Sequence, residues 1–206
     1  MGEPSVHGII LAAGKAERFG RDKLTVEYQG RALVSHVFGV VAAAVRQGLL
    51  AGGFVVLRAG AHSIEALARQ EGLTPVVNPD ADAGISASLR AGLAAIDSAG
   101  PRAGAAMVFP GDQPHVRLDV IGRLIETWRR GGSPAVRPRY SEEPGSPNHP
   151  VLLDATLWPL VSRLAGDSGF ASIFREHPEL VTTIDVAGRN PDMDTPLDLL
   201  QSSPAQ

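Results

Sequence analysis

Short apolar runs typical of buried strands alternate with helical patterns along almost the whole chain. The strand-like runs are rich in Val and Ile and end in turn residues; they cover residues 6–11, 54–57, 74–77 and 105–109. Apolar residues recur at helical spacing between them, over residues 32–47, 85–96 and 118–128. Strands separated by helices favour right-handed crossovers and a mainly parallel sheet covered on both faces. We therefore predict an α/β protein with a three-layer αβα, Rossmann-like fold.

The composition limits the kind of protein this can be. A chain of 206 residues, 44% hydrophobic and 20% charged, is expected to form one soluble domain with a substantial core. Its apolar stretches, such as residues 40–45, are far shorter than a membrane span, and the N-terminus does not resemble a signal peptide. Cysteine is absent and the net charge is -3. We therefore expect a cytoplasmic protein that uses neither a membrane nor nucleic acid as its main partner.

The sequence becomes rich in proline after residue 131. Five prolines punctuate residues 133–150, which predicts an exposed loop or flap over a site. Two helix-like segments, 154–164 and 167–175, follow, and then a strand at 181–186 and a terminal helix from about residue 195. We expect the boundaries of these last elements to be the least well defined.

The junction between the first strand and the segment after it carries the strongest functional signal. The run Leu11, Ala12, Ala13, Gly14 opens a small-residue loop, and glycine lets a ligand approach the backbone closely. Arg18 and Lys23 follow, with Arg21 between them. Cations beside free backbone N–H groups suit a polyphosphate better than a neutral ligand. The alternative is a glycine-containing strand-to-helix turn with surface cations.

The spacing of residues 11–23 excludes two common nucleotide motifs and resembles a third. Gly14, Gly20 and Lys23 fit neither a P-loop nor the dinucleotide-binding fingerprint. The segment resembles the L-A-A-G-x-S-x-R-x-G-x-x-K signature of the MobA-like nucleotidyltransferases, and within them the molybdenum cofactor cytidylyltransferase branch. Ala16 replaces the Ser of that signature. The resemblance implies a nucleotide-diphospho-sugar transferase-like version of the predicted fold.

Two acidic segments far apart in the sequence are candidate metal sites. Asp112 lies where the strand-like run at 105–109 ends, and a carboxylate there suits Mg²⁺, although a turn Asp that caps its own backbone is the alternative. The segment resembles the G-D-x-P element of the family, whose Asp binds the metal. Residues 190–199 resemble the D-x-D-T-P-x-D-L ending, which implies a second metal ligand at Asp194, with Asp192 as its substitute. Capping of a terminal helix is the alternative there.

A fourth segment resembles the nucleotide-contacting N-P-x-x-x-x-G-x-x-x-S-L element of the family. Its matches are Asn78, Gly84 and Ser88. A helix that begins near Gly84 would offer free N–H groups to a base or ribose, whereas simple capping by Ser86 is the alternative. The resemblance therefore implies a nucleotide site formed by these residues with Leu11, Ala12, Ala13, Gly14 and Lys23.

Two further segments resemble acceptor-binding elements. His149 lies in a stretch similar to G-H-P-V, with Asn148 where Gly is usual, and Asp167 lies in a stretch similar to G-D-x-G-A-R. Phe170 and Ala171 replace the Ala-Arg of the second element. The resemblance assigns His149 and Asp167 to the acceptor, and a surface role for the loop histidine is the alternative.

Together, the ordered matches imply one MobA-like domain over residues 1–206, with a nucleotide half at about 6–115 and an acceptor half at about 116–200. They imply Mg²⁺-dependent transfer of CMP from CTP, or of another nucleotide, to molybdopterin, with Arg18, Lys23 and Asp112 as catalytic residues. A molybdenum hydroxylase client is a further expectation. The alternatives are an NAD(P)H-dependent nicotine blue oxidoreductase, a transferase for another phosphorylated acceptor such as a sugar phosphate, and a non-catalytic cofactor carrier.

Overall fold

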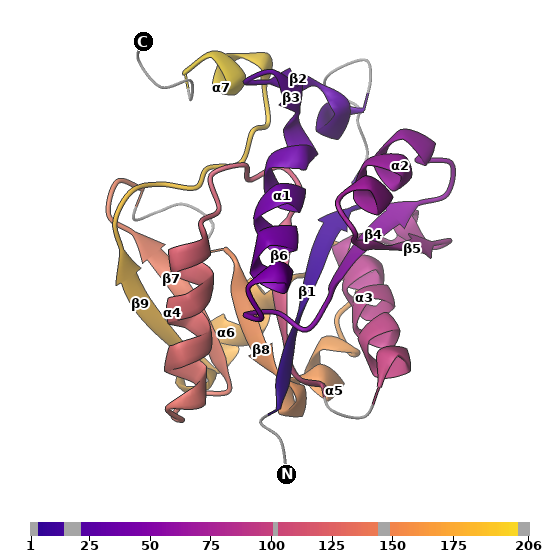
Figure 1. Ribbon diagram of the computed structural model, residues 1–206. Coiled ribbons are helices and arrows are strands. Elements are labelled where there is room, and N and C mark those ends of the chain that lie inside the picture. Colours follow the sequence, from indigo (N-terminus) through magenta and orange to yellow (C-terminus); the bar gives the residue numbers. More distant parts are fainter. Residues whose placement is uncertain (1–3, 15–21, 101–102, 144–148, 202–206) are drawn as a thin grey trace.

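The protein is described here from a computed structural model that covers residues 4–14, 22–100, 103–143 and 149–201. A central sheet of seven strands forms its core, in the order β5-β4-β1-β6-β8-β7-β9 (Figure 1). The strands are β1 (Ser5–Ala12), β4 (Gly53–Arg58), β5 (Thr74–Asn78), β6 (Ala103–Pro110), β7 (Ala135–Tyr140), β8 (Val151–Asp154) and β9 (Val181–Val186). All neighbouring strands pair in parallel except at β8, which is antiparallel to β6 and β7.

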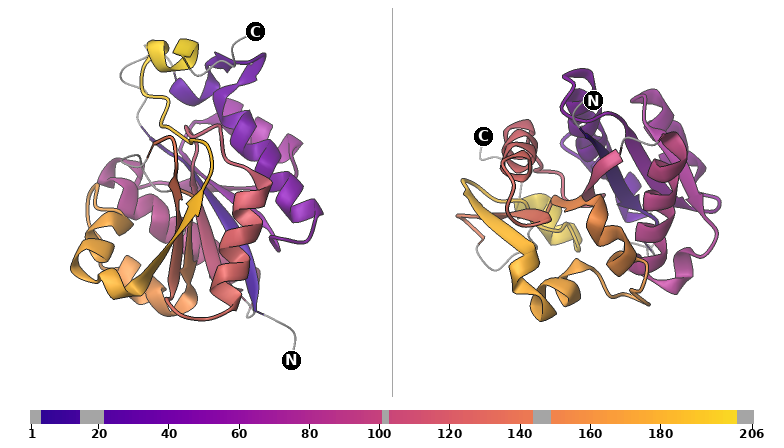
Figure 2. Two further views of the ribbon diagram at one scale, coloured as in Figure 1. Left: turned by 90° about the vertical axis from the view of Figure 1, so that its left-hand side faces the viewer. Right: turned by 90° about the horizontal axis from the view of Figure 1, so that it is seen from below.

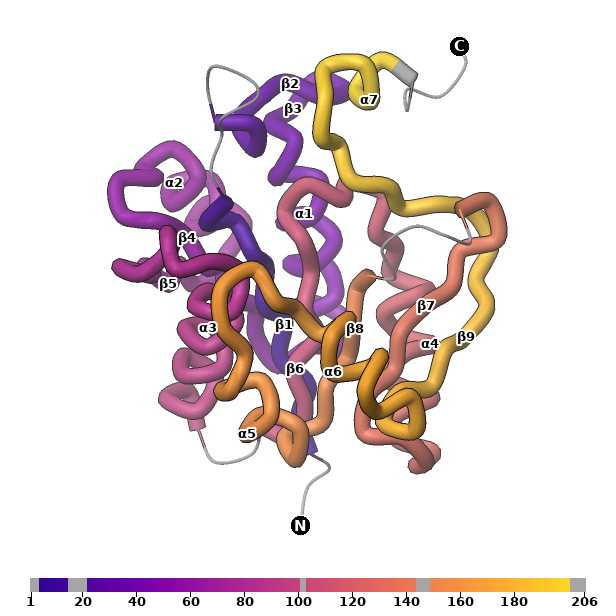
Figure 3. The backbone as a smooth tube through the Cα atoms, turned by 180° about the vertical axis from the view of Figure 1, so that it is seen from behind, coloured from indigo at the N-terminus to yellow at the C-terminus, as the bar shows by residue number. Residues whose placement is uncertain are grey.

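Helices cover both faces of this sheet, so the predicted three-layer αβα fold is confirmed. One face is packed by α1 (Leu33–Arg46), α2 (His62–Gln70) and α4 (Leu118–Arg129). The other is packed by α3 (Ile85–Ala99), α5 (Trp158–Val161) and α6 (Phe170–Glu176). The edge-on view in Figure 2 separates the layers, and Figure 3 shows α3, α5 and α6 in front of the sheet.

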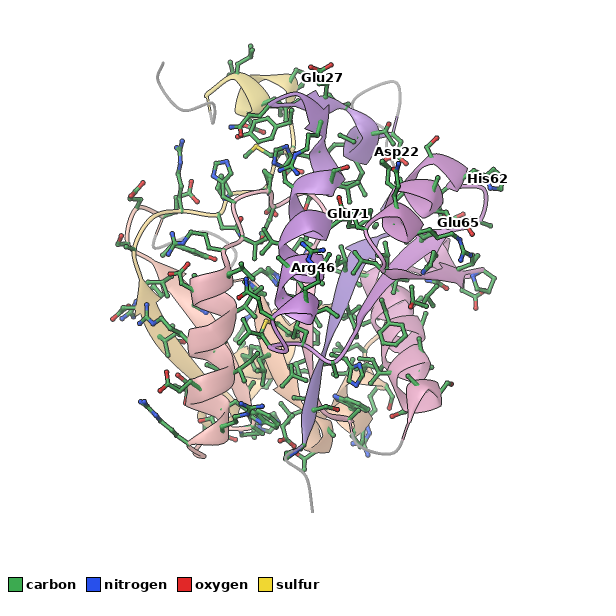
Figure 4. All side chains as sticks on the ribbon, viewed as in Figure 1. Asp22, Glu27, Arg46, His62, Glu65 and Glu71 are labelled. Carbon is green, nitrogen blue, oxygen red and sulfur yellow. The ribbon has the colours of Figure 1, made fainter. Side chains whose placement is uncertain are left out.

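The strands β1, β4, β6 and β8 are mostly apolar on both faces because each face is buried under helices. In β1, Ile10 packs toward α1 and Ile9 packs toward α3, and both are fully buried. The polar side chains of Glu27, Arg46 and His62 are exposed, and Figure 4 shows Glu27 and His62 near the outline of the molecule. The apolar side chains of these strands therefore contribute to two separate cores, one on each face of the sheet.

The prediction that residues 133–150 form an exposed loop was wrong for its first part. Residues 135–140 form the interior strand β7, which pairs with both β8 and β9. Proline normally disrupts a ladder because it lacks an N–H group. Here β8 pairs with β7 only at Ala135 and Val136, so Pro138 lies beyond the end of that ladder. Residues 144–148 of the predicted loop lie outside the described part of the chain.

The predicted helix at 154–164 was wrong in its extent. Residues 151–154 form strand β8, a 3-10 turn covers Ala155–Leu157, and α5 spans only four residues. The Asp154 carboxylate accepts a hydrogen bond from the Thr156 backbone N–H at 2.9 Å and thereby caps the turn. The predicted helix at 167–175 begins three residues late, as α6, whereas the strand at 181–186 was predicted correctly.

A small layer closes the end of the sheet where the parallel strands terminate. It contains the hairpin of β2 (Glu27–Tyr28) and β3 (Arg31–Ala32), the 3-10 turn η1 (Lys23–Thr25) and the terminal helix α7 (Pro196–Gln201). Tyr28 and Met193 are buried together with Leu33 and join the hairpin to the C-terminal segment. Figure 1 shows α7 beside β2 and β3. Among the described helices, none has the length and apolar character needed to cross a membrane.

Candidate active site

A cavity of about 640 Å³ opens at the carboxyl ends of the parallel strands, where ligands bind in open α/β sheets. Its walls come from the ends of β1 and β6, from the start of α3, and from three later segments of the chain. The lining residues are Leu11, Ala13, Gly14, Ala81, Asp82, Gly84, Ile85, Ser88, Pro110, Asp112, His149, Asp167, Asp192 and Asp194. The predicted site residues Ala12 and Asn78 do not line the cavity, and both are buried.

Lys23 bonds to the two predicted metal ligands, Asp112 and Asp194, both of which line the cavity. Its Nζ atom lies 2.7 Å from Asp112 Oδ2 and 3.0 Å from Asp194 Oδ1. The side chains of Lys23 and Asp112 are 19% and 24% exposed, whereas that of Asp194 is 54% exposed. Burial by itself lowers the pKa of Lys23, but the two carboxylates outweigh burial and raise that pKa above its ordinary value. Lys23 is therefore a permanent cation between two acidic side chains.

Local backbone interactions hold these three residues in place. Asp22 caps the η1 turn by accepting a hydrogen bond from the Leu24 N–H at 3.1 Å, which fixes the backbone next to Lys23. Asp112 follows β6 directly, and its carbonyl accepts a hydrogen bond from the Met193 N–H at 3.1 Å. Asp198 accepts from the backbone N–H of Asp194 at 2.9 Å. The segment that carries Asp194 is thus tied to the loop that carries Asp112.

A buried amide network, which was not predicted, makes a second connection between the same two segments. Gln113 is 1% exposed and donates to Asp192 Oδ1 at 2.8 Å, while Asn190 is 1% exposed and donates to Gln113 Oε1 at 3.1 Å. Burial raises the pKa of Asp192, and the nearby Asp112 charge adds to this rise. The two neighbouring aspartates thus have different partners: Asp192 accepts from Gln113, whereas Asp194 accepts from Lys23. The G-D-Q-P and R-N-P-D runs, residues 111–114 and 189–192, contain these amides but do not reveal their pairing.

Of the predicted nucleotide-binding residues from β5 to α3, two line the cavity and one supports them from behind. Ser88 and Gly84 line the cavity, and the buried Asn78 donates to Ser88 Oγ at 3.2 Å. Gly84 has φ +93°, and a Cβ added there would lie 2.3 Å from the carbonyl carbon of Gly166. The Ser86 N–H donates to the Gly166 carbonyl at 3.1 Å. The loop around Gly166 is therefore packed directly on the start of α3.

The two predicted acceptor residues also line the cavity. Asp167 is exposed at its rim, next to the Gly166 contact. His149 lies between this cavity and a second, smaller one. Burial lowers the pKa of His149 to about 4, and its Nδ1 atom is buried with no hydrogen-bond partner. The imidazole is thus neutral at neutral pH. Arg18 and Arg21, the other predicted cations, lie outside the described residues.

We expect acid to destabilise the fold through His149. Its pKa is about 4 when folded and 6.5 as the ordinary value, so the unfolded chain binds the proton first as the pH falls. Stability from this group is present above pH 6.5 and is lost toward pH 4, and the shift corresponds to roughly 3 kcal/mol. Urea unfolding of His149→Gln across this window should give a shallower pH dependence than the native chain. An unchanged slope would contradict the assignment.

The two carboxylates that meet at Lys23, those of Asp112 and Asp194, are suitable ligands for a hard divalent cation. Two carboxylates from segments over 80 residues apart bond to one ammonium group, so they are close enough to share one cation. Mg²⁺ is typically held by one or two carboxylates together with substrate phosphates and water. Asp112 and Asp194, which line the cavity, could supply such carboxylate ligands.

Comparison of the amino-acid sequence with known families and proteins shows the family of this chain. A family model described as "MobA-like NTP transferase domain" matches residues 8–181. The curated nicotine blue oxidoreductase of Paenarthrobacter nicotinovorans is 34% identical over 202 residues, which cover 93% of each chain.

Several solved structures have the same fold as this chain. Rv0371c of Mycobacterium tuberculosis is 28% identical with a TM-score of 0.80, over 98% of this chain and 100% of that one. Its complex with manganese is 26% identical, with a TM-score of 0.77 over 97% and 100% of the two chains. The 4-diphosphocytidyl-2C-methyl-D-erythritol synthase of Anaerococcus prevotii shares the fold, at 16% identity and a TM-score of 0.72 over 96% and 94%. The predicted nucleotide-diphospho-sugar transferase-like architecture is confirmed.

Proposed function

Because this chain belongs to the MobA-like NTP transferase domain family, we propose that it is a magnesium-dependent nucleotidyltransferase that transfers CMP from CTP to molybdopterin. The convergence of Asp112 and Asp194 on Lys23 is the observation that carries this proposal. Two carboxylates and a permanent cation beside a cavity of about 640 Å³ suit a metal–triphosphate. The manganese complex of Rv0371c supports the use of a divalent metal in this family.

The main task of such an enzyme is to position two anions and to neutralise their charge. In the proposed reaction, an oxygen of the acceptor's terminal phosphate attacks the α-phosphorus of CTP in line. The bond from the α-phosphorus to the bridging oxygen breaks, and pyrophosphate leaves with those electrons. The attacking phosphate is already ionised, so no side chain has to act as general base.

Each site residue has a separate part in this reaction. Asp112 and Asp194 would hold Mg²⁺, which would supply positive charge at the reacting phosphate. Lys23, which carries a permanent charge, binds the β- and γ-phosphates together with Arg18 and stabilises the departing pyrophosphate. Gly14, Gly84, Ser88, His149 and Asp167 all line the cavity. In this proposal the first three would contact the nucleotide, and His149 and Asp167 would contact the acceptor.

A second candidate function comes from the relative named nicotine blue oxidoreductase, at 34% identity. An enzyme of that type would consume NAD(P)H and would need no nucleoside triphosphate. The acidic lining of the cavity, with five aspartates, favours a metal–triphosphate, because a carboxylate repels an anion unless a cation lies between them. Transfer of a nucleotide is therefore the preferred function.

A pyrophosphate-release assay distinguishes these functions. We expect release when the protein is incubated with CTP, Mg²⁺ and molybdopterin, and less with GTP. Calorimetric titration of CTP and GTP in the presence of Mg²⁺ measures the preference directly. Oxidation of NAD(P)H without any triphosphate would instead establish the oxidoreductase, and binding of molybdopterin without pyrophosphate release from any triphosphate would establish a carrier.

A further inference from the structure

Two aspartates of the C-terminal segment, Asp192 and Asp194, line the same cavity, but Asp194 bonds to Lys23 and Asp192 does not. The described residues 189–194 form neither a helix nor a strand. No regular backbone hydrogen-bond pattern therefore determines which of the two carboxylates turns toward Lys23. Side-chain contacts have to make that choice.

The buried amide of Asn190 has an orientation that two backbone groups determine. Its Oδ1 atom accepts a hydrogen bond from the His115 backbone N–H at 3.1 Å, and its Nδ2 atom donates to the His149 carbonyl at 3.4 Å. A backbone N–H only donates and a carbonyl only accepts, so the oxygen and nitrogen of this amide cannot exchange places. Asn190 therefore presents its Nδ2 atom, a donor, to Gln113.

The orientation of Asn190 in turn determines that of Gln113. Asn190 Nδ2 donates to Gln113 Oε1 at 3.1 Å, so Gln113 Nε2 lies on the other side and donates to Asp192 Oδ1 at 2.8 Å. A reversed Gln113 amide would place two donors together at one end and two oxygen atoms together at the other. Both amide residues are 1% exposed, and buried polar groups without partners are costly. We call this chain, from the His115 N–H through Asn190 and Gln113 to Asp192, the amide relay.

We propose that Gln113 and Asn190 are positioning residues of the active site, because the amide relay retains Asp192 as a hydrogen-bond acceptor and leaves Asp194 as the carboxylate of this segment that binds the metal. This inference rests on the proposed function, which assigns the metal to Asp112 and Asp194. Gln113 directly follows Asp112 in the sequence. One short loop thus carries the first metal ligand and orients the segment that carries the second.

The amide relay requires the hydrogen bond of Asp192 and not its charge. The side-chain oxygen of an asparagine can accept the same bond from Gln113. A ligand of a hard divalent cation, in contrast, depends on the negative charge of a carboxylate. Substitutions that separate the bond from the charge therefore test the proposal.

Titration with Mn²⁺, followed by the electron paramagnetic resonance signal of the free ion, measures metal binding without any transfer reaction. Gln113→Met keeps the approximate size of the side chain and removes its hydrogen bonds, so we expect about ten-fold weaker Mn²⁺ binding, as is typical when a group that orients a metal ligand is lost. Asp192→Asn keeps the bond and should bind Mn²⁺ nearly as tightly as the native protein. Gln70→Met is the matched control, because Gln70 is exposed at the end of α2 and does not line the cavity.

Asn190→Asp tests the orientation of the amide relay independently of Gln113→Met. The new carboxylate can still accept from the His115 N–H, but it presents an acceptor to Gln113 in place of a donor. The Gln113 amide then has to reverse, and its oxygen repels Asp192. We expect weaker Mn²⁺ binding in this variant as well.

The same titrations can overturn the proposal. Native Mn²⁺ affinity in Gln113→Met and in Asn190→Asp would do so even if both variants unfold at a lower temperature, because a purely structural role changes stability alone. A larger loss in Asp192→Asn than in Gln113→Met would also do so, since Asp192 would then be a metal ligand itself. Asp194→Asn should weaken Mn²⁺ binding, and native affinity there would instead contradict the metal site of the proposed function.

Discussion

Replacing Asp112 with Asn is expected to reduce nucleotidyl transfer by at least about a hundred-fold, which is typical for loss of one preorganised electrostatic group at a reacting centre. The amide keeps the size of the side chain but removes the charge that faces Lys23 at 2.7 Å. It also weakens metal binding, because a neutral oxygen attracts a divalent cation less than a carboxylate does. Pyrophosphate release at several Mg²⁺ concentrations measures the loss and the shift in metal requirement.

The fold should tolerate this change, since Asp112 is partly exposed and Lys23 keeps its contact with Asp194. Thermal unfolding of Asp112→Asn should therefore stay close to that of the native chain. Asp185→Asn is the matched control, because Asp185 forms an exposed ion pair with Arg139 on β7, away from the cavity. If Asp112→Asn transferred nucleotide as fast as the native protein, Asp112 would not be a metal ligand and the proposed mechanism would be wrong.

Replacing Gly84 with Ala is expected to destabilise the protein by about 3 kcal/mol, a value typical of steric conflict at a constrained backbone position. The new Cβ would lie 2.3 Å from the Gly166 carbonyl carbon and 2.4 Å from its oxygen. These are backbone atoms, so no side-chain rotation relieves the contact. The loop that carries Asp167 must move away from α3, and substrate binding should weaken as well. Chemical denaturation and the KM for each substrate measure the two effects.

Gly60→Ala separates this contact from simple backbone strain. Gly60 has φ +83°, close to the +93° of Gly84, but an added Cβ would meet nothing within 4 Å. The dihedral strain alone should cost about 1 kcal/mol. Equal losses of stability in the two variants would show that the Gly166 loop is not packed on α3 as described.

The fold was largely predictable because most strands of the parallel part of the sheet are apolar on both faces. Such strands contrast clearly with the helices between them, as in residues 6–11 and 105–109. The strand β7 was missed because its prolines and arginines, in the run Ala135–Tyr140, are typical of a loop. Its pairing with β9 depends on residues more than 40 positions later, which no local pattern reveals.

The main charged residues of the candidate site were predictable, but the groups that support them were not. The resemblance of two distant motifs implied that Asp112 and Asp194 act on one metal, and the structure brings both carboxylates to Lys23. The amides of Gln113 and Asn190 were missed because buried glutamine and asparagine carry no spacing signal of their own.

The amino-acid sequence by itself determined the layered α/β architecture, the family and the acidic and basic residues available for chemistry. These follow from local periodicity and short motifs, which depend on neighbours along the chain. Only the tertiary structure decided that Asp194 rather than Asp192 meets Lys23, and that a second, smaller cavity lies beside the first. Both depend on contacts between segments far apart in sequence, whose geometry is set by the packing of the whole sheet and its helices.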